Sequence, residues 1–135
     1  MTAPTSAALQ HPVQPVATAG NDLNQVFHIA PRASAVTSVT YTPSATITGA
    51  ATNTRSVSLV NLGQNGAGAT VVATLQFNNG VNAPVGVPKT IPLSGTPANL
   101  QLAAGDVLQW QSTHVGTGIV DPGGLVSVAS SANYA

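Results

Sequence analysis

The sequence has very little charge: 4 % of its 135 residues are Asp, Glu, Lys or Arg, where an ordinary soluble domain has about 25 %. Glutamate is absent, and the six charged residues are Asp22, Arg32, Arg55, Lys89, Asp106 and Asp121. Because the formal net charge is zero, the chain has no row of cations to neutralise phosphates, and we expect no nucleic-acid partner. The same shortage predicts no attraction to an anionic membrane.

Cysteine is also absent, which excludes disulfides, thiol catalysis and Cys-based zinc sites. No apolar run approaches the roughly 18 residues of a transmembrane helix, so we expect no membrane span. The first basic residue is Arg32, and no charged segment of a signal peptide precedes it. These absences predict a chain that is made in the cytoplasm of its host cell and used without secretion through the usual route.

Groups for catalysis are few: three histidines (His11, His28, His114) and the three aspartates. No G-x-S-x-G motif occurs, and no Glu is available as the acid of a carboxylate pair. Asp106 follows Gly105, and Asp121 precedes Pro122 and Gly123, contexts in which Asp usually begins a tight turn. We therefore expect no enzyme activity, no metal site and no cofactor.

What the sequence does have is 17 Val and 16 Thr, residues that favour strands. Eight short segments rich in such residues are bounded by Gly, Pro or Asn, at residues 26–29, 36–41, 55–62, 70–77, 89–93, 100–102, 107–112 and 125–129. This spacing predicts an all-β fold, with an eight-stranded jelly-roll β-sandwich first and a seven-stranded immunoglobulin-like sandwich second.

Trp110 is the one residue that could stack on a sugar. It alternates with Leu108 on one face of its segment, while Gln109 and Gln111 occupy the other. This period of two favours a place in the core over a sugar-binding platform.

Residues 1–23 contain three prolines and isolated apolar residues, a pattern typical of an extended N-terminal arm; residues 24–135 then form the β-sandwich domain. A frayed terminus is the alternative interpretation. The candidate contacts of the arm with a capsid or another subunit are Leu9, Val13, Val16 and Leu23, with His28 just after it. His28 alternates with Phe27 and Ile29, which predicts that it faces a polar or subunit-facing surface.

The C-terminal half resembles the closing strands of small capsid decoration proteins of tailed bacteriophages. The resemblance rests on Leu102-Ala-Ala-Gly-Asp-Val-Leu108 and on His114-Val-Gly-Thr-Gly, followed by a Pro/Gly turn and Val126-Ser-Val128. The segment from Arg55 to Asn61 resembles the central strand of those proteins, so the likeness covers roughly residues 55–130.

The resemblance implies a jelly-roll cement protein on the exterior of the capsid in the virion. Such a protein would bind the major capsid protein, stabilise the shell by clamping neighbouring subunits, and assemble with itself as a homotrimer. An arm reaching onto the shell or a neighbouring copy fits that role. Two other hypotheses stay open: a phage tail or fibre domain that binds host carbohydrate, and a self-assembling bacterial surface subunit.

Overall fold

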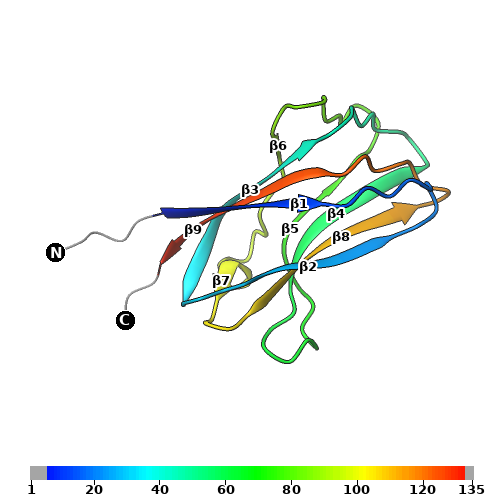
Figure 1. The fold of residues 1–135 in the computed structure, drawn as a ribbon. Coiled ribbons are helices and arrows are strands. Elements are labelled where there is room, and N and C mark those ends of the chain that lie inside the picture. Colours follow the sequence, from blue (N-terminus) through cyan, green and yellow to red (C-terminus); the bar gives the residue numbers. More distant parts are fainter. Residues whose placement is uncertain (1–5, 133–135) are drawn as a thin grey trace.

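Two antiparallel β-sheets packed face to face make up the molecule (Figure 1). The computed structural model describes residues 6–132. The strands are β1 (Ser6–Val13), β2 (Leu23–Ile29), β3 (Ser34–Pro43), β4 (Thr54–Asn61), β5 (Thr70–Gln76), β6 (Lys89–Thr90), β7 (Gln101–Leu102), β8 (Val107–Val115) and β9 (Gly124–Ala132). A single 3₁₀ turn, Pro97–Leu100, is the one helical element of the described residues.

The strand order confirms the predicted jelly roll. One sheet runs β1-β9-β3-β6, with β7 also paired to β3, and the other runs β2-β8-β4-β5. The pairs are nested: β1 pairs with β9, β2 with β8, β3 with β6 and β7, and β4 with β5. This is the pattern of one long antiparallel hairpin rolled into a sandwich. A jelly roll has eight strands. This structure has nine because two short strands, β6 and β7, both pair with β3 and together take the place of the sixth strand of the jelly roll.

Each of the eight predicted segments coincides with a strand, and the ninth strand, β1, was not predicted. It lies inside the expected arm, where Ser6–Val13 pair with β9 without a break from Ser6↔Ser131 to Val13↔Gly124. The described part of the expected arm therefore belongs to the sandwich, and residues 1–5 lie outside the described residues. Pro12 is compatible with this position because β1 is an edge strand, where a missing N–H costs little.

Side chains from both sheets fill the space between them. The buried core includes Val39, Tyr41, Leu59, Phe77, Leu108 and Trp110, each fully buried. The rings of Tyr41 and Trp110 pack at a tilt of 54°, with their centroids 5.5 Å apart. The prediction that Trp110 is a core residue is confirmed, and its indole is closed to any ligand at the surface.

Candidate binding surface

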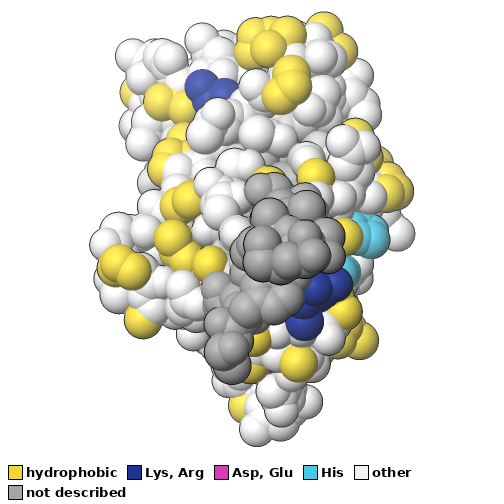
Figure 2. Space-filling view, turned by 90° about the vertical axis from the view of Figure 1, so that its left-hand side faces the viewer, with side chains coloured by type: hydrophobic (Ala, Val, Ile, Leu, Met, Phe, Trp, Pro, Cys, Tyr) yellow, Lys and Arg dark blue, Asp and Glu magenta, His cyan; other side chains and the backbone are white. Residues whose placement is uncertain are grey.

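Half of the charged side chains are inside the molecule. Arg55, Asp106 and Asp121 are buried, which leaves Asp22, Arg32 and Lys89 as the charged side chains in contact with solvent. The surface is therefore even poorer in charge than the composition indicates. Figure 2 shows one end of the molecule, where scattered hydrophobic, basic and histidine side chains are visible and no acidic one is.

Asp121 is the centre of a buried hydrogen-bond network. Its carboxylate accepts hydrogen bonds from the hydroxyls of Tyr41 and Ser112, both at 2.6 Å, and from the backbone N–H of Gly123 at 3.0 Å. Burial and the negative charge of Asp121 raise the pKa of Tyr41 far above its ordinary value. The bond to the Gly123 N–H, two residues on, confirms the predicted turn at Asp121.

Arg55 ties this network to the segment between β1 and β2. Its guanidinium donates to Ser112 Oγ at 3.1 Å and to the carbonyl of Ile119 at 2.6 Å. The carbonyls of Ala19 and Asn21 accept two further bonds at 2.9 and 3.0 Å. Burial lowers the pKa of Arg55, and the charge of Asp121 opposes that shift. The Arg55 guanidinium therefore has a structural role: it fixes the segment between β1 and β2 to the buried network of Ser112 and Asp121.

Asp106 closes the turn that leads into β8. Its carboxylate accepts hydrogen bonds from Asn61 Nδ2 at 3.0 Å and from the N–H of Ala103 at 2.8 Å. Gly105 supplies the left-handed residue of the turn, with φ of 89°, a conformation that glycine adopts without steric cost. The predicted turn at Gly105-Asp106 is confirmed.

Asp22 and His114 form an exposed pair at the start of β2. The Asp22 carboxylate is 2.6 Å from His114 Nδ1 and accepts the backbone N–H of His114 at 2.8 Å. These hydrogen bonds lower the pKa of Asp22. All three aspartate side chains therefore have partners within the chain.

The outer face of the β2-β8-β4-β5 sheet is a ladder of uncharged side chains. Because cross-strand partners share a face, the pairing builds one row of Val26, Gln109, Val60 and Val71, and a second row of Asn24, Gln111, Ser58 and Thr74. Val26 and Val71 are 54 % and 40 % exposed, whereas Val60 between them is buried at 3 %. Ile29, opposite Val107, is 60 % exposed. We call these residues the outer ladder.

Four of the five polar side chains of the outer ladder pair with one another. Ser58 Oγ lies 2.8 Å from Thr74 Oγ1, and Gln111 Nε2 donates to Gln109 Oε1 at 2.8 Å. A polar group that already has a partner costs less to remove from water than a free one. The outer ladder is therefore a surface that another protein can cover without burying charge.

The second candidate feature is the open edge, where the edge strands β1 and β2 of the two sheets face each other. His11 of β1 packs against two rings of β2, with centroids 5.1 Å from Phe27 and 6.0 Å from His28. A β-bulge at Phe27 shifts the register so that His28 pairs with Leu108. As a result His28 shares a face with the buried Leu108, away from the exposed Ile29, and is half-buried. Its predicted contact with a polar or subunit-facing surface stays a prediction. Burial and the nearby His11 lower the pKa of His28.

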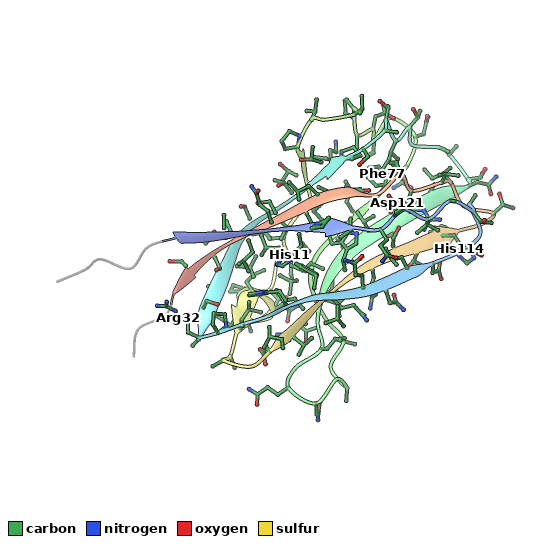
Figure 3. All side chains as sticks on the ribbon, in the orientation of Figure 1. His11, Arg32, Phe77, His114 and Asp121 are labelled. Atoms are coloured by element: carbon green, nitrogen blue, oxygen red, sulfur yellow. The ribbon has the colours of Figure 1, made fainter. Side chains whose placement is uncertain are left out.

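We call His11 and His28 the histidine cluster. A cavity of about 130 Å³ opens beside it, at the end of the sandwich where Arg32 lies (Figure 3). Its apolar lining comes from both sheets and includes Leu9, Leu102, Leu108 and Val128. Its polar lining is His28, Arg32, Ser34 and Ser130. Arg32 is exposed, while Leu108 and Val128 are buried, so the pocket has an apolar floor and a basic rim. We call it the edge pocket.

The structure separates the five residues expected to contact a capsid or another subunit. Val13 and Val16 are buried, at 5 % and 6 % exposure, and Val16 also forms a backbone bridge with Asp121. Leu9 and His28 are half-buried and meet in the edge pocket, and Leu23 is half-buried at the start of β2. Sequence reasoning missed the outer ladder because the pairing of four strands is needed to bring its rows together.

Other kinds of site find little support among the described residues. Tyr41, Phe77 and Trp110 are buried and Phe27 is partly buried, so none of these rings forms a flat exposed platform. Within residues 6–132 no three His, Asp or Glu side chains gather as metal ligands. No helix in that range is long and apolar enough to cross a membrane.

Comparisons with known proteins leave the family open. No protein-family model and no curated protein sequence matches the chain. A solved structure of infectious bursal disease virus, Gx strain, is similar over 93 % of this chain, with a TM-score of 0.43 and 7 % identity. The chain spans about a third of the length of that viral chain, 32 %. The assignment of the jelly roll therefore rests on the strand pairing itself.

Proposed function

We propose that the chain is a structural virion protein: a decoration, or cement, protein that binds the outer surface of a tailed-phage capsid. The observation that supports this proposal most is the outer ladder, a sheet face with exposed valine and isoleucine, internally paired polar side chains and no charge. Such a face suits burial against another protein. It offers no cations for nucleic acid, and the part of the chain that the structure describes offers no exposed aromatic platform for sugar.

Stabilisation of a shell would follow from linkage. A protein that binds the assembled shell and not its separated subunits stabilises the shell by RT ln(1 + [L]/Kd) at each site. A jelly roll placed across a junction between major capsid proteins would add this free energy at many copies. The chain itself would need no catalysis and no cofactor, and assembly as a homotrimer would raise the strength of attachment through multivalency.

The first test places the chain on the particle. Native virions that contain it are labelled with gold-conjugated antibodies against the folded protein and imaged by electron microscopy. We expect gold on the capsid exterior. Gold confined to the tail or its fibres would overturn the proposal and favour carbohydrate binding.

The second test addresses the outer ladder with a matched pair of variants, Val26→Lys and Val85→Lys. The two valines are equally exposed, at 54 % and 55 %, but Val85 lies in the loop before β6, away from the ladder. In co-sedimentation with capsids that lack the protein, we expect Val26→Lys to lower occupancy and Val85→Lys to leave it unchanged. Equal occupancy by both variants would exclude the outer ladder as the contact.

Salt provides a third measurement on the same capsids. Because so few charges reach the surface, occupancy should change by less than about tenfold between about 0.05 and 1 M salt. A steep loss of binding with salt would show that charge, and not the uncharged ladder, supplies the affinity.

A further inference from the structure

We infer that the edge pocket binds an extended segment of a partner protein, which inserts one aliphatic side chain and places a carboxylate on Arg32. The inference deepens the proposed function, on which it rests, because the partner it describes is the capsid subunit. Three features of the described residues support it: an unpaired guanidinium, an apolar cavity of limited size and a free strand edge.

None of the three aspartate side chains is free to pair with Arg32. Asp22 is bound to His114, Asp106 to Asn61 and Ala103, and Asp121 to Tyr41 and Ser112. No hydrogen bond or ion pair of the Arg32 side chain occurs within residues 6–132. Arg32 therefore stands at the mouth of the pocket as a cation without a carboxylate partner among the described residues. Arg is suited to such a contact because its planar fork matches a carboxylate.

The size of the cavity selects the apolar part of the ligand. Its volume of about 130 Å³ is close to that of an engineered apolar cavity of about 150 Å³ that takes up benzene. A leucine, isoleucine or valine side chain fits this space, whereas an indole would not. The floor of Leu102, Leu108 and Val128 offers such a side chain apolar contacts on several sides.

The free edge of β1 explains why the ligand is an extended chain. β1 pairs with β9 on one side, and no described strand pairs with it on the other. Gln25 covers the end of that edge by bonding the N–H of Gln14 and the carbonyl of Pro12, which leaves the part beside Leu9 open. A strand added there would place every second side chain on the same face as Leu9, toward the pocket.

The test uses two synthetic peptides and the isolated protein. The first, acetyl-Thr-Leu-Thr-Asp-Thr-amide, has Leu and Asp on the same face of a strand; the second has Asn in place of Asp. In two-dimensional ¹H–¹⁵N NMR titrations we expect the acidic peptide to shift the signals of residues around Leu9 and Ser130, with Kd on the order of 1 mM. The peptide with Asn in place of Asp should bind about fivefold more weakly, as expected when one partly exposed ion pair is lost.

Three variants complete the experiment. Arg32→Gln should remove the difference between the two peptides, while Lys89→Gln, which changes the other cation in contact with solvent, should keep it. Ser130→Leu fills the pocket and should weaken both peptides alike. Equal affinity of the two peptides for the unaltered protein, or shifts that avoid the pocket, would overturn the inference.

Two further outcomes are distinguishable. If the pocket signals shift when the protein alone is concentrated, a second copy is the occupant and the inference is wrong. If neither peptide binds while the protein still attaches to capsids, the inference fails and the proposed decoration function stands.

Discussion

Replacement of Arg55 by methionine tests how the segment between β1 and β2 is held. Methionine keeps an unbranched side chain of similar length but removes every donor, and with them the bonds to Ser112, Ile119, Ala19 and Asn21. Charge-assisted hydrogen bonds contribute about 1.5–3 kcal/mol each, but burying the guanidinium costs several kcal/mol. Removing one member of a buried charged network destabilises by about 3–5 kcal/mol. We expect the lower end, about 3 kcal/mol, because three of the four acceptors are only partly buried.

Urea unfolding followed by the fluorescence of the buried Trp110 measures this change. A loss of about 3 kcal/mol corresponds to a drop in Tm of about 10–15 °C for a domain of this size. Arg32→Met is the matched control, since its exposed guanidinium has no partner among the described residues and its loss should leave the free energy of unfolding unchanged. An Arg55→Met variant within about 1 kcal/mol of the unaltered protein would refute the role assigned to Arg55.

A double-mutant cycle shows whether Arg55 and Asp121 act as one network. Asp121→Asn alone leaves Arg55 without its opposing charge, and Arg55→Met alone leaves Asp121 without a cation nearby. We expect the double variant to be more stable than the sum of the two single losses predicts, by about 1–3 kcal/mol. Strict additivity in the same urea assay would show that Ser112 does not couple the two charges.

Three more predictions concern the strand β1, the histidine cluster and the buried tryptophan. Deleting residues 1–13 removes β1 and the buried Val13, so the free energy of unfolding should fall by about 3 kcal/mol or more; an unchanged urea midpoint would mean that the segment is only an arm. Burial and His11 lower the pKa of His28 below its ordinary 6.5, so the unfolded chain binds a proton that folded His28 resists. Stability should therefore fall below about pH 6.5, and His28→Gln should reduce that fall in urea titrations. Trp110 fluorescence should not respond to sugars, and a saturable shift on adding a host glycan would contradict its burial.

The positions of most strands along the chain could be predicted from local patterns because each strand has its own signal. Alternating apolar residues and Gly, Pro or Asn boundaries located β2 to β9, and the jelly roll followed from their number and spacing. β1 has a weaker sequence signal. It is an edge strand that pairs with one neighbour only, and Pro12 in its sequence indicates an irregular segment. Its place in the sheet depends on β9, more than 110 residues later, which a local pattern does not contain.

The candidate surfaces depend on still longer-range information. His28 shares a face with Leu108 because one bulge at Phe27 shifts the alternation by a residue, and a bulge leaves no clear mark in a sequence. The outer ladder joins residues of four strands, and the edge pocket joins β1, β2, β3, β7, β8 and β9. Composition could predict that the surface would be almost uncharged, but only the pairing shows which uncharged side chains share a face.

Burial of half the charges has a consequence for crowding. With Asp22 next to His114, the charges without a partner among the described residues are the exposed Arg32 and the half-buried Lys89. Two unit charges about 20 Å apart in water repel by about 0.2 kcal/mol, and salt at physiological strength reduces this further because the Debye length is about 8 Å. Neighbouring copies on a shell would therefore repel one another by less than thermal energy. Contacts made through the outer ladder and the edge pocket can then attach each copy to the shell, because they do not have to overcome a large repulsion between neighbouring copies.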